Sequence, residues 1–477
     1  MTHAELEREL EEKGRELLRQ LYQDHLTLRG DGEVRGPVID AKGEERTHLR
    51  LQGRAIETIF GEVTVERAGY GGRGMESLHP LDAELNLPQE KFSLEVRRRA
   101  AIEAGRGSFD EAVEAMARGT GADIAKRQLE ELVVRAAQDF DDFYTSREAV
   151  PLAPSPDSLL VLTVDGKGIV MRKEALREGT RKAAETERHH YEKRLARGEK
   201  ANRKRMATVA ALYDIAPFVR TAASVMAGAH LAEASAPRPR PQGKRVWASV
   251  EKEMEDVVAQ LFEEALRRDP ARARKWVVLL DGNEHQLKLV KKYARKHKVK
   301  PTIVLDLVHV LERLWKAAHC FFPEGARQLE QWVSQRLERL LEGKASDVAA
   351  GIRRAATRRG MSVGFRRAAD ECADYILNYK KLLKYDRYLA QGMPIGTGVI
   401  EGACRHLVKD RMDLTGARWG LAGAEAVLRL RSLRSSGDFD EYWRFHENEE
   451  RLRNHACLYA DATPPATAKG GQLRVIK

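Results

Sequence analysis

The sequence predicts an α/β core that is interrupted by a helical insertion and preceded by a mainly helical N-terminal domain. Continuous apolar, β-rich runs alternate with helical patterns between about residues 159 and 306, which is typical of strands buried on both faces of a sheet. Over residues 310–392 the pattern is entirely helical, and a Gly-rich turn then opens one more helix. Alternating strands and helices with a late helical block favour the α/β class.

Changes in composition give the expected domain boundaries. Residues 1–150 are expected to form the N-terminal domain, which ends in a Pro/Ser-rich linker. The remaining boundaries follow the change of pattern: first part of the core at 151–309, insertion at 310–392, second part of the core with a glutamate-bearing helix at 393–446, and a tail at 447–477.

The N-terminal domain is expected to begin with an amphipathic helix over residues 1–28. Apolar residues on both sides of a Phe60-Gly61 turn predict a small antiparallel hairpin at residues 55–67. The domain is therefore mainly helical with a small β element.

A helix-turn-helix outline covers residues 108–143. Ser108 and Glu111 form the sequence signature of a capping box, and Asp123 is expected to cap a second, longer helix. Lys126 and Arg127 fall in the first turn of that second helix, which makes them candidate DNA-binding residues. An ordinary helical hairpin has the same outline.

Charge and composition narrow the class of partner. The 477-residue chain carries a formal net charge of +11, which favours a polyanion such as DNA. No apolar run is long enough to span a membrane, so no membrane partner is expected. The four cysteines are too far apart for a C-x-x-C metal or redox motif, and a reducing cytoplasm, with the chain at the nucleoid, is the expected location.

Three of the apolar runs end in an aspartate: Asp165, Asp281 and Asp306. Carboxylates that converge at the carboxyl edge of a sheet repel one another unless a cation lies between them, and hard oxygen ligands favour Mg²⁺ or Mn²⁺. Alternatively, Asp-Gly simply closes a strand into a turn. Asp306 is also a good N-cap for the next helix, and His309 is either a neighbour of the metal site or a core histidine.

Glu401 lies in the segment GTGVIEGACRHLVKDRM, where it is the one carboxylate on a face with Arg405 and Lys409. A metal ligand beside the DNA phosphates would have this pattern, and so would an exposed charged helix. Other candidate DNA contacts, each with a structural alternative, are Lys167, Arg411 and Trp419.

Together, the segments VDGKG, LLDGN, D-x-x-H and GTGVIEGACRHLVKDRM with the following TGARW resemble the DDE transposases of bacterial insertion sequences, and the ISKra type in particular. The D-x-x-H motif is also similar to the corresponding motif of the eukaryotic Mutator-like enzymes. This resemblance extends over about residues 45–445. It implies an RNase H-like catalytic core, Asp165, Asp281 and Glu401 as the catalytic, metal-binding triad, and Asp306 with His309 as an accessory pair.

The resemblance also implies an activity. A transposase of this type cleaves DNA and transfers strands at the terminal inverted repeats of its own insertion sequence, using two Mg²⁺ (or Mn²⁺) ions that stabilise the attacking and leaving oxygens. The implied partners are double-stranded DNA, as transposon ends and target, and further copies of the chain in a homodimer or higher oligomer. Two alternatives remain: a domesticated, non-catalytic DNA-binding protein, and a metal nuclease of the same fold.

Overall fold

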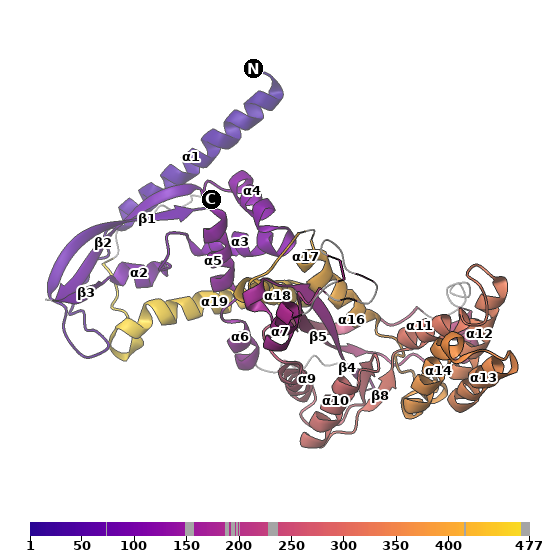
Figure 1. Cartoon of the computed structure of the whole chain (residues 1–477). Helices are drawn as coiled ribbons and strands as arrows, with labels where there is room; N and C mark the ends of the chain where they lie inside the picture. The colour runs from indigo at the N-terminus through magenta and orange to yellow at the C-terminus, as the bar shows by residue number, and fades with distance from the viewer. Residues whose placement is uncertain are drawn as a thin grey trace. The chain divides into compact units, whose positions relative to one another are not determined.

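The chain folds into two compact units, Met1–Arg147 with Ala422–Lys477 (unit 1) and Glu148–Leu421 (unit 2) (Figure 1). Unit 1 contains a three-stranded antiparallel sheet and unit 2 a mixed five-stranded sheet, so the predicted α/β class is confirmed. Within the described part of the chain, no helix is long and apolar enough to cross a membrane. The computed structural model describes residues 1–72, 74–147, 157–186, 190–191, 196, 199, 201–227, 237–414 and 416–468.

Unit 1 begins with helix α1 (His3–Arg29), which confirms the helix expected over residues 1–28. The expected hairpin is confirmed and is longer than the sequence suggests, since it consists of β1 (His48–Thr58) and β2 (Gly61–Gly72). A short third strand, β3 (Met75–Leu78), pairs with the other side of β2. Leu26 of α1 packs against apolar side chains of the hairpin, which fixes the C-terminal half of α1 to the sheet.

Five shorter helices follow: α2 (Pro80–Leu85), α3 (Leu94–Arg106), α4 (Phe109–Gly119), α5 (Lys126–Ala136) and α6 (Phe140–Ser146). The capping box of Ser108 and Glu111 is confirmed at the start of α4. The expectation that Asp123 caps one long helix is wrong. Ala122 and Ile124 are buried on an extended segment, so helix α5 begins only at Lys126, and a turn separates it from α6.

Helices α18 (Leu421–Ser436) and α19 (Phe439–Asn454) belong with unit 1, which corrects the expected assignment of 393–446 to the core and of 447–477 to a tail. Tyr442 of α19 donates a hydrogen bond to the Ala136 carbonyl (2.7 Å), and Tyr144 donates one to Asp438 (2.8 Å). The buried residues of α18 lie on most of its circumference, so its pattern gives no one-sided signal that would reveal its partner.

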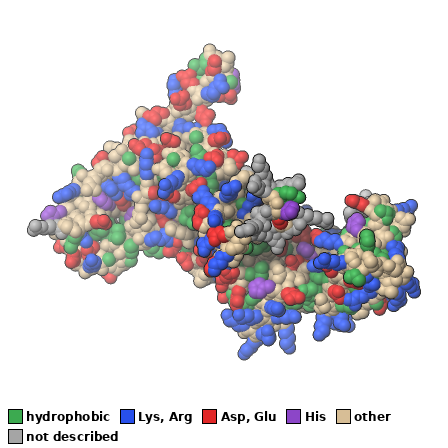
Figure 2. Space-filling view, viewed as in Figure 1, with side chains coloured by type: hydrophobic (Ala, Val, Ile, Leu, Met, Phe, Trp, Pro, Cys, Tyr) green, Lys and Arg blue, Asp and Glu red, His purple; other side chains and the backbone are tan. Residues whose placement is uncertain are grey.

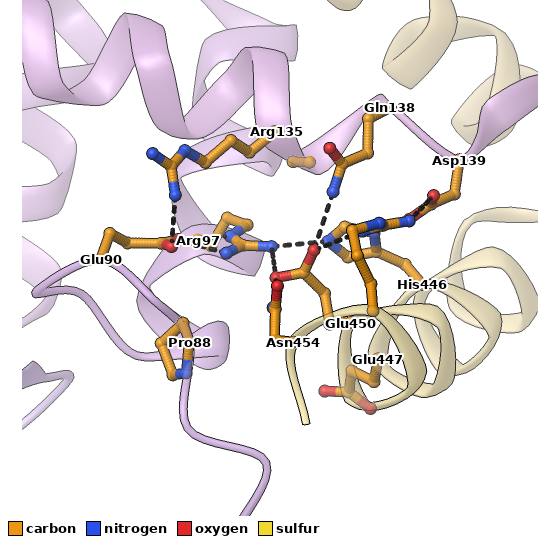
Figure 3. Close-up of polar contacts among 12 residues, drawn as sticks. Pro88, Glu90, Arg97, Arg135, Gln138, Asp139, His446, Glu447, Glu450 and Asn454 are labelled. Atoms are coloured by element: carbon orange, nitrogen blue, oxygen red, sulfur yellow. Dashed lines mark hydrogen bonds and ion pairs between the residues drawn. The ribbon is translucent and has the colours of Figure 1, made fainter. Parts of the chain in front are cut away.

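A buried polar network joins α3, the turn before α6 and α19 (Figure 3). Asp139 lies 2.6 Å from Nδ1 of His446, and the Arg97 guanidinium lies 2.9 Å from its Nε2. Because arginine only donates, Nε2 accepts and Nδ1 carries the hydrogen. Arg97 also pairs with Glu450 (2.8 Å) and with Glu90. Asp139, His446 and Glu450 have the donor types of a metal site, but Arg97 already supplies the positive charge there.

We predict that Arg97→Ala destabilises the protein by about 3–5 kcal/mol, because it removes the fully buried cation that pairs with both Glu450 and Glu90 and leaves Glu450 only its pair with the more exposed Arg453. Arg106→Ala, on the same helix, removes an exposed ion pair with Glu103 and should change stability by less than about 1 kcal/mol. Urea unfolding followed by circular dichroism measures both. Equal midpoints for the two variants would contradict a structural role for the network.

The five-stranded sheet of unit 2 has the order β6-β5-β4-β7-β8. Neighbouring strands β6, β5 and β4 are antiparallel, whereas β7 is parallel to β4 and β8 is parallel to β7. The strands are β4 (Leu159–Val170), β5 (Lys204–Ile215), β6 (Gln242–Ser249), β7 (Trp276–Leu280) and β8 (Thr302–Leu305). Helix α9 (Met254–Arg268) leads from β6 to β7, and α10 (Glu284–Lys296) connects β7 to β8.

The segment after β8 is built from helices, as its pattern predicts: α11 (Leu307–Ala318), α12 (Arg327–Leu341), α13 (Ala345–Arg358), α14 (Val363–Asn378) and α15 (Tyr385–Ala390). Their apolar residues form one core with strands β7 and β8. The hydroxyl of Tyr385 donates to the Leu305 carbonyl at the end of β8 (2.8 Å). This helical block is therefore anchored directly to the strand ends that carry the candidate site.

Candidate metal centre

Asp165 lies within β4 rather than at its end, which corrects the expectation from the sequence. Strand β4 continues to Val170, and Asp165 pairs with Val209 of β5. The Asp-Gly step looks like a turn locally, but antiparallel pairing with β5 extends the strand. The parallel neighbour β7 stops at Leu280, so Asp165 lies where the parallel part of the sheet ends.

The strand register brings three aspartates to one level of the sheet. Thr163 pairs with Leu279, so two residues further on Asp165 is level with Asp281. Leu280 pairs with Leu305, which makes Asp281 level with Asp306, and the Asp306 N–H donates to the Leu280 carbonyl (2.7 Å). Adjacent strands lie about 4.8 Å apart, so the three residues form a short row across β4, β7 and β8.

Asp306 is fully buried and already has three donors. Its carboxylate accepts hydrogen bonds from the backbone and from Nδ1 of His309 (3.0 and 2.7 Å) and from the Thr397 N–H (2.8 Å). It also caps α11, as one of the two sequence interpretations expected. Burial alone would raise the pKa of Asp306, but the hydrogen bonds from His309 and Thr397 outweigh burial and hold that pKa below its ordinary value.

His309 faces Asp306 from the first turn of α11. The hydrogen bond to Asp306 raises the pKa of His309 to about 9 against the opposing effect of burial, and the negative charges of Asp306 and Asp281 add to the rise. Since Nδ1 is engaged by a carboxylate, Nε2 is the ring atom left to face a ligand, as in carboxylate–histidine pairs around metals.

Glu401 lies on α16 (Gly398–Ala403), the short helix after the Gly-rich turn. Its carboxylate, that of Asp306 and the ring of His309 each offer a ligand atom, and these atoms all lie within 4.8 Å of one another. Thr397 connects the two acids, because its N–H donates to Asp306 and its hydroxyl donates to Glu401 (3.2 Å). The accessory pair and the predicted glutamate are thus brought together, whereas among the described residues neither Asp165 nor Asp281 belongs to this group.

Cys404, which the sequence interpretation did not single out, links the helix of Glu401 to β4. Its thiol donates to one oxygen of Asp165 (3.3 Å), while the Gly166 N–H donates to the other (2.6 Å). Burial, together with the negative charge of Asp165, raises the pKa of Cys404. The helix becomes π-helical from Cys404 to Lys409, a distortion that is frequent at functional sites. The available sequence signal was its position, one turn after Glu401.

The loop after β7 is held by the helical block. Tyr375 and Tyr379 of α14 donate to the carbonyls of Asp281 (2.9 Å) and Gly282 (2.6 Å). Gly282 has a φ of +92°, and a Cβ there would lie 2.6 Å from the Tyr375 hydroxyl, so only glycine fits. The pocket beside this loop has both acidic and basic walls and is lined by Asp281, Gly282, Asn283, His309, Glu312, Arg313 and Lys316.

The candidate DNA contacts of unit 2 divide into two groups. Lys167, Arg405 and Lys409 are exposed, as a phosphate contact requires. Arg411 and Trp419 are 2% and 5% exposed, so the expectation that they contact DNA is wrong for this conformation. Arg411 lies over the Trp419 ring at 4.7 Å, and the backbone of Trp419 continues the pairing at the end of β4, which buries both side chains.

In unit 1, Lys126 and Arg127 lie on the first turn of α5 and both are exposed. Lys126 pairs with Asp110 of α4 (2.7 Å), and Arg127 pairs with Glu131 one turn along (3.2 Å). Such exposed pairs are weak and exchange readily for a phosphate.

No family model and no curated protein matches this sequence. Among solved structures, the chain is similar to the Drosophila P element transposase strand transfer complex, with 11% identity and a TM-score of 0.25 over 78% of this chain and 83% of that chain.

We predict that the cysteines differ strongly in reactivity toward Ellman's reagent at pH 8. Cys457 is exposed and should react first, whereas burial raises the pKa of Cys372 to about 12 and also protects Cys404. Both buried thiols should react only after unfolding, and peptide mapping assigns each modified position. Rapid modification of Cys404 in the native protein would contradict its contact with Asp165.

Proposed function

We propose that this chain is a DDE transposase of the ISKra type, which cleaves and joins DNA at the inverted repeats of its own insertion sequence. The observation that carries the proposal is the acidic row of Asp165, Asp281 and Asp306, with the helix of Glu401 hydrogen-bonded to Asp165 through Cys404. Carboxylates from distant parts of the chain gather at one sheet edge, which is costly unless they serve a cation.

The architecture supports an RNase H-like interpretation of unit 2. Three antiparallel strands followed by two parallel ones, with the first strand in the centre, is the arrangement that the family resemblance implies for the core. On this interpretation, helices α11–α15 are the insertion before the glutamate, and unit 1 recognises the DNA ends.

The donor set fits Mg²⁺ or Mn²⁺, because Asp165, Asp281 and Glu401 offer only hard oxygen ligands. When bound, two such ions would stabilise the attacking and leaving oxygens of a phosphodiester. The protein's own part is to hold the ligands. Asp165 is fixed by Cys404 and by a backbone N–H, and Thr397 positions Glu401.

Asp306 takes a supporting role in this proposal. It is buried and has three donors, so it orients His309 rather than binding an ion itself. His309 would then present Nε2 to a phosphate or to a ligand of the metal.

Exposed cations near the site supply the phosphate contacts. Lys167, Arg405 and Lys409 lie on the elements that carry Asp165 and Glu401. Figure 2 shows further Lys and Arg side chains gathered over α10, the helix that follows Asp281. Residues 284–300 contain seven Lys and Arg against one acidic residue, which suits a DNA backbone.

We predict that Asp165→Asn, Asp281→Asn and Glu401→Gln each reduce Mg²⁺-dependent cleavage of a plasmid carrying the gene with its flanking DNA. The expected loss is at least about a thousandfold, which corresponds to about 4 kcal/mol of activation free energy. DNA binding should remain. The exposed Asp413→Asn is the matched control and should cleave normally.

Each alternative function gives a different outcome in the same assay. Wild-type protein that binds the flanking DNA but cleaves nothing would indicate the domesticated DNA-binding protein. Cleavage without preference for the flanking repeats, and without strand transfer, would indicate a metal nuclease. Normal cleavage by Asp281→Asn would refute the triad itself.

We predict that Lys126→Ala with Arg127→Ala weakens binding of the full chain to the terminal repeat by about tenfold, since exposed cations on the first turn of α5 suit a recognition helix. The paired control is Arg106→Ala, an exposed cation on α3. Fluorescence anisotropy at several salt concentrations measures affinity, and the double variant should also show a shallower salt dependence. Unchanged affinity would assign recognition to another element.

A further inference from the structure

Helix α1 carries an exposed stripe of leucines. At 100° per residue, the members of the stripe fall within an arc of about 60° on the helix surface. Each is between 45% and 60% exposed, which is unusual for so many leucines on one face. The leucine stripe consists of Leu6, Leu10, Leu17, Leu21 and Leu28.

The opposite face of α1 already makes the contacts that hold the helix to unit 1. Arg15 donates to the carbonyl of Thr120 (2.9 Å), Gln23 exchanges hydrogen bonds with the backbone of Thr64 (2.9 and 2.8 Å), and Leu26 is buried. These side chains point about 130–170° from the middle of the stripe on a regular helix. The leucine stripe is therefore not needed for the fold of unit 1.

The spacing of the stripe matches a helix–helix seam. Its members recur at intervals of four or seven residues, with Gly14 between Leu10 and Leu17 and Asp24 between Leu21 and Leu28, which is close to the 3.5-residue repeat of a coiled coil. Helix α1 has 27 residues and is thus about 40 Å long. Each leucine is about half exposed, so pairing removes the remaining apolar surface of five leucines per helix from water, and this gain offsets the entropy of association.

Charge favours an antiparallel pair. Residues 5–12 contain five glutamates and one arginine, whereas basic residues outnumber acidic ones over residues 13–29. Two parallel helices would place the acidic halves side by side. In an antiparallel pair, the acidic half of each helix lies beside the half of its partner in which basic residues outnumber acidic ones.

We infer that α1 is a self-association element, through which two copies of this chain pair by their leucine stripes as an antiparallel coiled coil. This pairing needs neither DNA nor a metal ion, so its test is separate from the test of the proposed chemistry. No different partner protein is required, because a second copy of the chain supplies the same leucine stripe.

The first experiment measures mass by sedimentation equilibrium on the full-length protein at about 10 μM, without DNA. Wild type should have twice the mass of the chain, and Leu10→Glu with Leu17→Glu should have the mass of one chain. Both sites are exposed and glutamate is a good helix former, so circular dichroism should be unchanged. Leu49→Glu with Leu51→Glu, exposed leucines on β1, is the matched control and should stay dimeric.

The second experiment determines orientation by disulfide cross-linking in a Cys457→Ser background, which removes the exposed native thiol. Leu6→Cys combined with Leu28→Cys should form cross-linked dimers efficiently, whereas Leu6→Cys alone should not. A monomeric wild type, a dimeric α1 double variant, or a control pair that dissociates the dimer would overturn the inference. Efficient cross-linking of Leu6→Cys alone would overturn the antiparallel arrangement.

Discussion

Mutual repulsion of carboxylates is the constraint on which the site depends. At a separation of about 5 Å and an effective dielectric constant of about 20, two unit charges repel by about 3 kcal/mol. Hydrogen-bond donors stabilise each carboxylate against this repulsion: the thiol of Cys404 donates to Asp165, the hydroxyl of Thr397 to Glu401, and the ring of His309 to Asp306. The apolar strands β4, β7 and β8 behind the acids provide the rigid frame that keeps them level.

Much of this frame could be predicted from local patterns. Each apolar run of unit 2 that was interpreted as a strand is one, because a strand buried on both faces needs apolar residues at every position. Asp281 and Asp306 follow their strands as expected. Asp165 does not end its strand, since pairing with β5, about forty positions further along the chain, overrides the local turn signal.

Long-range packing accounts for what the sequence did not reveal. Burial of Arg411 and Trp419 depends on the segment at Trp419 pairing with the end of β4, and no local pattern specifies that contact. The sequence signal for Cys404 is limited to its position one turn after Glu401, and its contact with Asp165 depends on the packing of that helix against β4. Asp306 caps α11, as one of its two interpretations expected, and it also lies beside Glu401, because one of its oxygens accepts from the His309 N–H and the other from the Thr397 N–H.

The return of α19 to unit 1 has a consequence for biosynthesis. The contact between Arg97 and His446 cannot form until His446, which lies 349 positions later in the chain, has been synthesised. At about 5–20 residues per second, the ribosome needs roughly 20–70 s to cover that interval. During this time all of unit 2 emerges while the buried charges of unit 1 still lack their partners. A nascent chain that stops before residue 439 cannot complete unit 1, so translation order delays completion of unit 1 until after unit 2 has been made.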